Sequence, residues 1–147
     1  MKANGELSEY FIQCAVMNGS AMLRPVPKGS ATEIAILEFA ENNGYDYEAE
    51  KQRYKIIAKF PFSSKRKRMS TLIQFENGQR RLVTKGGSEI ILDVCNSLYS
   101  PNDSLVVPLT SDLRAFIKQN IQEMGGNALR TMSLAYKNIP QEEDIIT

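Results

Sequence analysis

Apolar side chains recur at intervals of three and four residues in the first part of the chain, which is the pattern of amphipathic helices. Residues 8–18 carry one such stripe and precede Gly19. A second stripe follows Ser30 and runs to Asn43-Gly44, where a glycine favours a helix end. Ser30 and Glu33 have the spacing of a capping box. We therefore predict two helices in this part of the chain.

The hydrophobic period then changes to two, which is the pattern of strands. Residues 55–62 alternate in this way, and Pro61 marks the edge or the end of a strand because it cannot donate to a ladder. Residues 69–75 predict a second strand, and Asn77-Gly78 is a strong hairpin signal before a third strand over residues 80–85. We expect three consecutive antiparallel strands.

Helical spacing returns over residues 88–98 and again from Thr110 or Ser111 to Gly125-Gly126. A final strand is predicted over residues 129–136. Strands grouped in a hairpin meander, with helices before and after them, are typical of an α+β domain. The expected fold is therefore an antiparallel β-sheet flanked by helices.

Composition limits the domain organisation and the partners. With 147 residues, 42% of them hydrophobic, residues 1–147 fit a single domain with a real core. The net charge of +1 argues against a nucleic-acid or membrane-surface partner. No run of about 18 apolar residues occurs, so we expect a soluble chain. Cys14 and Cys95 lie in apolar helical segments, which favours a reducing compartment.

Several kinds of chemistry are absent from the sequence. The chain has no histidine, which excludes Ser-His and Cys-His nucleophile pairs and histidine-bound metals. The phosphate-loop and dinucleotide fingerprints are missing, and the two cysteines are too far apart for a zinc knuckle. We therefore expect neither a catalytic residue nor a metal site in this chain.

Polar and basic residues nevertheless gather at the predicted strand ends. Phe62 precedes a basic turn at Lys65–Arg68, and Lys85 with Gly86-Gly87 lies where a strand gives way to a helix. An aromatic face can stack on a base, an ammonium can meet a phosphate, and paired glycines let a ligand approach the backbone. This combination of residues suits a nucleotide.

Each of these residues also has a simpler structural interpretation. Phe62 continues one apolar face of its strand, which favours a place in the core. The turn Lys65–Arg68 is typical of a solvated loop, or of a protein- or nucleic-acid-interaction module. Gly86-Gly87 can simply punctuate the chain, and the capping box already accounts for Glu33. On the residues alone, a nucleotide site is the weaker hypothesis.

Four separated motifs, in the right order, resemble the nucleotide-binding domain of P-type ATPases, particularly that of plasma-membrane-type calcium pumps. The strings are Ala31-Thr32-Glu33, Phe62 through Ser70, Lys85 through Leu92 with Cys95, and Ala128 through Tyr136. The resemblance covers nearly the whole chain and implies the fold of that domain.

The resemblance also implies a set of nucleotide-binding residues. Phe62 would stack on adenine, Lys85 would lie deep in the pocket near the base and the phosphates, and Glu33 would contact the polar edge of adenine. Lys67 would line the same pocket. Arg130 would reach the phosphate end.

Four further positions follow from the same resemblance. Gly86 and Gly87 would leave room for the ligand, and Thr32 and Met132 would form parts of the wall. Gly87 stands where an alanine is usual in the family, and Ser64 stands where some members have an arginine that touches phosphate.

The Asp-Lys-Thr-Gly-Thr motif that carries the phosphorylated aspartate of this family is absent. The resemblance therefore implies a monomeric cytosolic module that binds ATP without hydrolysing it and makes no direct contact with the membrane or with nucleic acid. In the parent pump, with Mg²⁺, it would deliver the γ-phosphate to that aspartate. Its partners would be the phosphorylation and actuator domains. The alternative is an interaction module that uses Lys65–Arg68.

Overall fold

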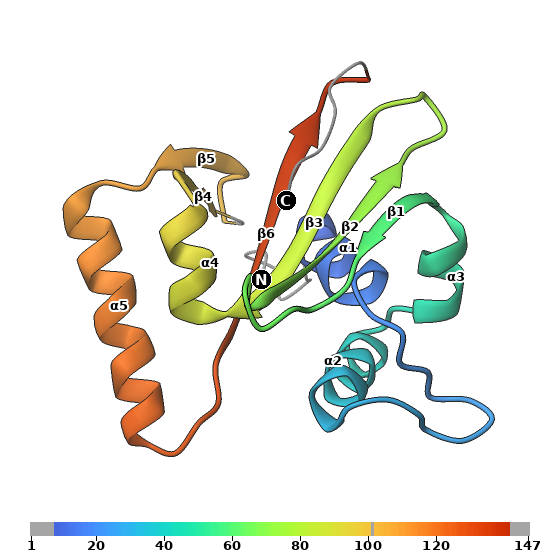
Figure 1. Ribbon diagram of the computed structural model, residues 1–147, viewed down its shortest axis with the longest axis horizontal. Helices are drawn as coiled ribbons and strands as arrows, with labels where there is room; N and C mark the ends of the chain where they lie inside the picture. Colours follow the sequence, from blue (N-terminus) through green and yellow to red (C-terminus); the bar gives the residue numbers. More distant parts are fainter. Residues whose placement is uncertain (1–7, 101, 142–147) are drawn as a thin grey trace.

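The computed structural model describes residues 8–100 and 102–141 (Figure 1). Its main sheet is antiparallel, with strand order β1-β2-β3-β6, and a separate ribbon pairs β4 with β5. The strands are β1 (Lys55–Phe60), β2 (Arg68–Gln74), β3 (Arg80–Gly87), β4 (Ser97–Ser100), β5 (Leu105–Pro108) and β6 (Met132–Ile139). The helices are α1 (Glu9–Met17), α2 (Ala31–Asn42), α3 (Tyr47–Gln52), α4 (Ser88–Val94) and α5 (Ser111–Gly126). The predicted α+β fold is confirmed.

Helix α1 lies at the centre of the fold. The Ser8 hydroxyl caps it by accepting a hydrogen bond from the Phe11 N–H at 3.1 Å, and all residues from Ile12 to Met17 are buried. One side of α1 packs on α2 and α3 in an apolar cluster that includes Leu37, and the other side packs on the sheet. Because α1 connects these parts, the first turn of α2 is held close to β3.

The helix predicted over residues 88–98 is shorter than expected and ends at Val94. Cys95 has extended backbone angles, with φ −93° and ψ 145°. The Arg114 guanidinium, from α5, donates to the carbonyl oxygens of Leu92 at 2.6 Å and Cys95 at 2.9 Å. These bonds satisfy carbonyl groups that a helix leaves open at its C-terminus. The following residues form β4, which the periodicity did not predict.

The last strand is also displaced from its predicted place. It begins at Met132, the first residue with a partner on β3, and not at Leu129. Leu129 and Arg130 are exposed in the loop between α5 and β6 (Figure 1). Helix α3 was not predicted, although Asp46 gives it a helix start by accepting hydrogen bonds from two backbone N–H groups.

The prediction that Pro61 marks the end of a strand is confirmed, because β1 ends one residue earlier, at Phe60. The apolar face predicted for this strand, Ile56, Ala58, Phe60 and Phe62, is confirmed only in part: Ala58 and Phe60 are half-buried, whereas Ile56 is exposed. The register with β2 shifts between Ile56 and Ala58, so that Ile57 is bulged, and both isoleucines are exposed. A bulge interrupts the alternation of faces that the sequence pattern assumed.

Candidate functional site

The polar residues predicted at strand ends meet at one end of the main sheet. Arg68, the first residue of β2, pairs with Gly86, and Gly87 pairs with Met132, the first residue of β6. The loop that joins β1 to β2 therefore lies beside the end of β3 and the start of β6. Lys67 is the last residue of that loop. The antiparallel register thus brings three separate sequence segments together.

A partly buried ion pair connects this end of the sheet to α2. The Lys85 Nζ lies 2.8 Å from the Glu33 Oε1, and the two side chains are only 8% and 18% exposed. The backbone N–H of Glu33 donates to the Ser30 hydroxyl at 3.2 Å, as the capping box predicted, while its carboxylate turns to Lys85. A buried ammonium is costly unless a carboxylate accompanies it. The pair is therefore a feature of the tertiary structure that the cap alone does not account for.

Beside this ion pair is a narrow cavity of about 10 Å³, which is room for about one water molecule. Gly19 leaves part of this space open: a Cβ atom there would lie 3.0 Å from the Glu33 Oε1 and 3.3 Å from the Lys85 Nζ. Sequence reasoning placed Gly19 only at a helix end and did not single out Lys51. The residues lining the cavity are Ala15, Val16, Gly19, Ala21, Glu33, Leu37, Lys51 and Lys85.

Phe62 lies in the loop after β1, and its interpretation as a core residue is wrong. It is 64% exposed. The chain leaves the sheet after Phe60, so Phe62 no longer follows the alternation of the strand. An aromatic ring exposed to this extent offers a face to a ligand.

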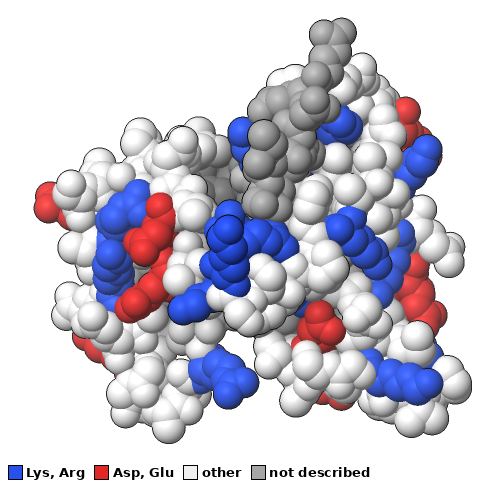
Figure 2. Space-filling model, in the orientation of Figure 1, with Lys and Arg blue, Asp and Glu red and all other residues white. Residues whose placement is uncertain are grey.

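The basic turn is held in shape by its own hydrogen bonds. The Lys67 N–H donates to the Ser63 carbonyl at 2.7 Å, and the Arg66 guanidinium donates to the carbonyls of Phe60, at 3.1 Å, and Pro61. Lys67 has a left-handed φ of 53°, which is uncommon for a residue other than glycine. Because Arg66 folds back on the loop, the run is not a row of four outward-facing cations. Basic groups elsewhere on the face in Figure 2 are interspersed with acidic ones.

Gly86 is required by the close approach of the β1–β2 loop. A Cβ atom on Gly86 would lie 2.7 Å from the Lys67 carbonyl oxygen, whereas a Cβ on Gly87 would have no neighbour closer than 3.8 Å. The two glycines therefore have different roles. Gly86 permits backbone contact, and the structure gives no steric reason for Gly87.

We expect Gly86→Ala to lower the free energy of unfolding by about 1–3 kcal/mol, because the added methyl group must displace backbone. Gly87→Ala is the matched control. With φ −53° and ψ 137° at Gly87, alanine fits there, so this change should be neutral or stabilise the protein slightly. Denaturant unfolding of both variants measures the difference. Equal stability of the two variants would contradict the assigned contact.

The remaining predicted residues surround this end of the sheet. Thr32 precedes Glu33 on α2 and is half-buried, Met132 begins β6, and Arg130 is exposed in the loop just before it. Within the described part of the chain, Phe62 and Arg130 form no side-chain hydrogen bond or ion pair with the rest of the predicted set. The structure thus joins Glu33 to Lys85 directly and leaves the exposed members separate.

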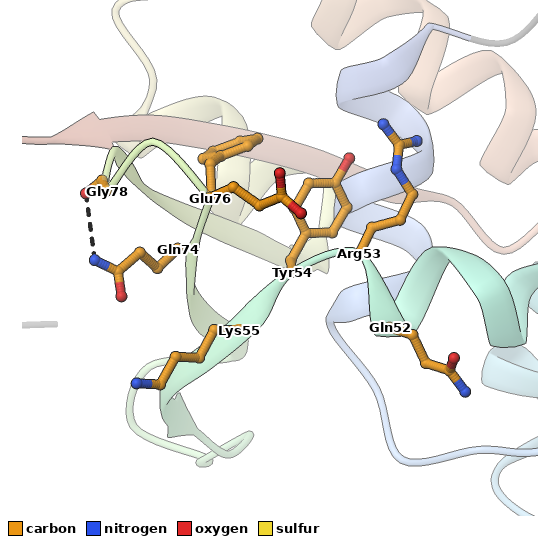
Figure 3. A pocket seen from close by; sticks show the side chains of 8 residues that line it. Gln52, Arg53, Tyr54, Lys55, Gln74, Glu76 and Gly78 are labelled. Carbon is orange, nitrogen blue, oxygen red and sulfur yellow. Dashed lines mark hydrogen bonds between the residues drawn. The ribbon is translucent and has the colours of Figure 1, made fainter.

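A larger open hollow of about 460 Å³ lies at the opposite end of the sheet, beside the β2–β3 hairpin (Figure 3). Its polar groups are partly engaged, since Arg53 pairs with Glu50 at 3.1 Å and the Gln74 amide donates to the Gly78 carbonyl at 3.4 Å. No residue of the predicted site lines it. We therefore place the candidate site at the Lys85 end. The hollow is lined by Gln52, Arg53, Tyr54, Lys55, Gln74, Phe75, Glu76 and Gly78.

The described residues, 8–100 and 102–141, contain no group of three or more Cys, Asp or Glu side chains placed to hold a metal ion. None of their helices is both long enough and apolar enough to cross a bilayer.

Residues 8–145 match the family model of the P-type ATPase cytoplasmic domain N. The chain belongs to this family. The family that the sequence motifs resemble is thereby confirmed, as is the expectation of a cytoplasmic domain.

Similar proteins carry this N domain within much longer chains. The chain is 40% identical to the calcium-transporting ATPase PAT1 of Dictyostelium discoideum over 78% of its length. It is 39% identical to the plasma membrane-type calcium-transporting ATPase 2 of Arabidopsis thaliana over 76% of its length. It is 31% identical to the calcium-transporting ATPase 1 of Lactococcus lactis over 81% of its length. The matched segment of this chain covers 10%, 11% and 13% of the lengths of these relatives, respectively.

Proposed function

We propose that this N domain binds ATP at the Lys85 end of its sheet and presents the γ-phosphate to a phosphorylatable aspartate on a neighbouring domain of a calcium pump. One observation carries the proposal most directly. The partly buried pair of Lys85 and Glu33 lies at the same sheet end as the exposed Phe62 loop and Gly86. An ammonium, a carboxylate and an aromatic face would there serve one nucleotide.

The proposed roles follow from the chemistry of these groups. The Phe62 ring would stack on adenine. Lys85 and Glu33 would supply a donor and an acceptor for the polar atoms of the base. Lys67 and Arg130, both exposed, would meet the phosphates as positive charges.

The weaker wall contacts belong to the same proposal. Thr32 neighbours Glu33 on α2, and Met132 lies opposite Gly87 across the β3–β6 ladder. Both are therefore close to groups that would hold the base. Gly86 would keep the loop near the ligand, and Gly87 adds no side chain to the space.

The chain contributes binding and positioning to phosphoryl transfer, and not the nucleophile. The Asp-Lys-Thr-Gly-Thr string is absent from its sequence. Holding ATP in place for a neighbouring aspartate is an entropic contribution to the reaction. The described residues offer no carboxylate cluster for a cation, so Mg²⁺ would arrive bound to the phosphates. The phosphorylation and actuator domains of the parent pump would be the partners.

Phe62→Ala tests the proposal. We expect ATP binding to weaken by about 1–3 kcal/mol, the usual contribution of one base-stacking aromatic residue. The melting temperature should stay unchanged, because Phe62 is 64% exposed and outside the core. Isothermal titration calorimetry and thermal unfolding measure the two quantities separately.

Phe116→Ala is the matched control, since Phe116 is 61% exposed on α5 and is not part of the proposed site. ATP affinity in this variant should equal that of the unmodified chain. If saturating ATP produces no binding signal with the unmodified chain, or if Phe62→Ala binds ATP normally, the proposed site is wrong.

A further inference from the structure

A second lysine lies on the cavity beside the Glu33–Lys85 ion pair. Lys51, in the last turn of α3, lines this space together with Gly19. The sequence motifs that resemble the P-type ATPase family do not include Lys51, and no strand end or glycine pair points to it. Its position results from the packing of α3 against α1 and α2.

The charges around this cavity are unequal. Two ammonium groups, those of Lys51 and Lys85, share the single carboxylate of Glu33. Lys85 donates to Glu33 at 2.8 Å, whereas Lys51 donates to the backbone carbonyl of Ala21 at a longer 3.3 Å. Lys51 is partly buried, and the Glu33 carboxylate near it is already engaged by Lys85. Because an ammonium has three donor hydrogens, Lys51 can bind a further acceptor.

Burial is the main influence on the Lys51 ammonium. Burial lowers the pKa of Lys51 from its usual value of 10.5, and the positive charges of Lys59 and Lys85 lower it further, while Glu33 and Glu48 oppose the change. These groups come from β1, β3, α2 and α3. The ammonium of Lys51 is thus partly desolvated, with the Tyr47 ring centroid 5.7 Å away, and a hydrogen-bond acceptor on a ligand would compensate for the lost water.

We propose that Lys51 is a further binding residue at the base end of the site, where it donates to a hydrogen-bond acceptor on the edge of the base that Glu33 also contacts. This inference rests on the proposed nucleotide-binding function. Glu33 accepts a hydrogen bond from an N–H group of the base, and Lys51 donates one to a neighbouring ring nitrogen. Together the two side chains recognise a base edge that has a donor beside an acceptor. Adenine has such an edge in its exocyclic amine and adjacent ring nitrogen.

Gly19 supplies the space for this contact. The cavity holds about one water-sized group, at about 10 Å³, so only the edge of a base enters and its ring stays outside. A side chain at Gly19 would press on the Glu33 and Lys85 head groups at 3.0 Å and 3.3 Å. The missing side chain therefore keeps the groups that contact the base accessible.

The experiment compares ATP with adenosine, which has the same base and no phosphate. Lys51→Met should lower the affinity for both ligands by the same factor, roughly tenfold, which corresponds to the loss of one hydrogen bond from a charged donor. Lys51→Arg, which retains the positive charge and the donors, should recover most of the affinity. Heteronuclear NMR titration measures both ligands under one set of conditions.

Lys59→Met is the matched control, because Lys59 is an exposed lysine near Lys51 that does not line the cavity. It removes the same charge and should leave adenosine affinity unchanged. Thermal unfolding of every variant separates a binding role from a structural one that acts through the Ala21 carbonyl.

Three results would overturn the inference. Weakened ATP binding with normal adenosine binding would show that Lys51 acts only through long-range attraction to phosphate. A lowered melting temperature with unchanged affinities would make Lys51 a structural residue. If Lys51→Met binds both ligands normally while Phe62→Ala binds them weakly, the role proposed for Lys51 is wrong and the proposed function stands. If the unmodified chain binds neither ligand, the proposed function itself fails.

Discussion

Lys85→Met is expected to lower ATP affinity by about 10- to 100-fold, the range for losing a hydrogen bond from a charged donor. The ammonium of Lys85 is buried and held 2.8 Å from Glu33, so its position is largely set before ligand binds. Methionine has a side chain of similar length and resembles the apolar methylene stem of lysine, but it cannot donate a hydrogen bond. Calorimetric titration with ATP measures the loss.

The same substitution should lower the free energy of unfolding by about 1–3 kcal/mol, because the Glu33 carboxylate loses its hydrogen-bonded partner. Glu33→Gln is the informative comparison, since its amide oxygen can still accept from Lys85. A Lys85→Met variant that binds ATP normally would make the ion pair purely structural. The double variant, Lys85→Met with Glu33→Gln, shows whether the two side chains act together, because coupled residues give non-additive effects.

Ile73→Ala is expected to lower the free energy of unfolding by about 2–5 kcal/mol, the range for truncating a buried isoleucine. Ile73 is 0% exposed in β2 and packs in the cluster that joins α1 to the sheet, with Met17 and Val83. Its removal leaves a cavity between these elements. Urea denaturation, followed by circular dichroism, measures the change.

Ile57→Ala is the control for this prediction. Ile57 is 41% exposed at the bulge of β1, so its truncation should cost much less than that of Ile73. A similar loss in the two variants would contradict the assigned core. Because Ile73 lies outside the proposed site, the folded fraction of Ile73→Ala should still bind ATP.

Local patterns predicted most of the elements because their determinants are close together in sequence. The Ser30 cap, the Asn77-Gly78 hairpin and the end of β1 before Pro61 all occur where expected. Helix α5 was also predicted, with its start at Thr110 or Ser111 and its end at Gly125-Gly126. Capping, turn geometry and periodicity act within a few residues, so one sequence is enough to recognise them.

Other features depended on contacts that local patterns do not contain. Helix α4 ends early because Arg114, from another helix, bonds its terminal carbonyl groups. Ile56, predicted on the apolar face of β1, is exposed next to the bulge at Ile57, and Phe62 is exposed because the chain has left the sheet before it. In both cases the pattern assumed that regular alternation continues beyond the point where strand pairing changes.

By itself, the sequence determined the fold class, the family and the residues expected to bind a nucleotide, because motifs and periodicity are carried by the chain. Only the tertiary structure decided that Glu33 meets Lys85, that Gly86 is required by the Lys67 carbonyl, and that Lys51 shares their cavity. Glu33 and Lys85 are 52 positions apart. Their contact follows from α1 packing between α2 and the sheet, and no local pattern records that packing.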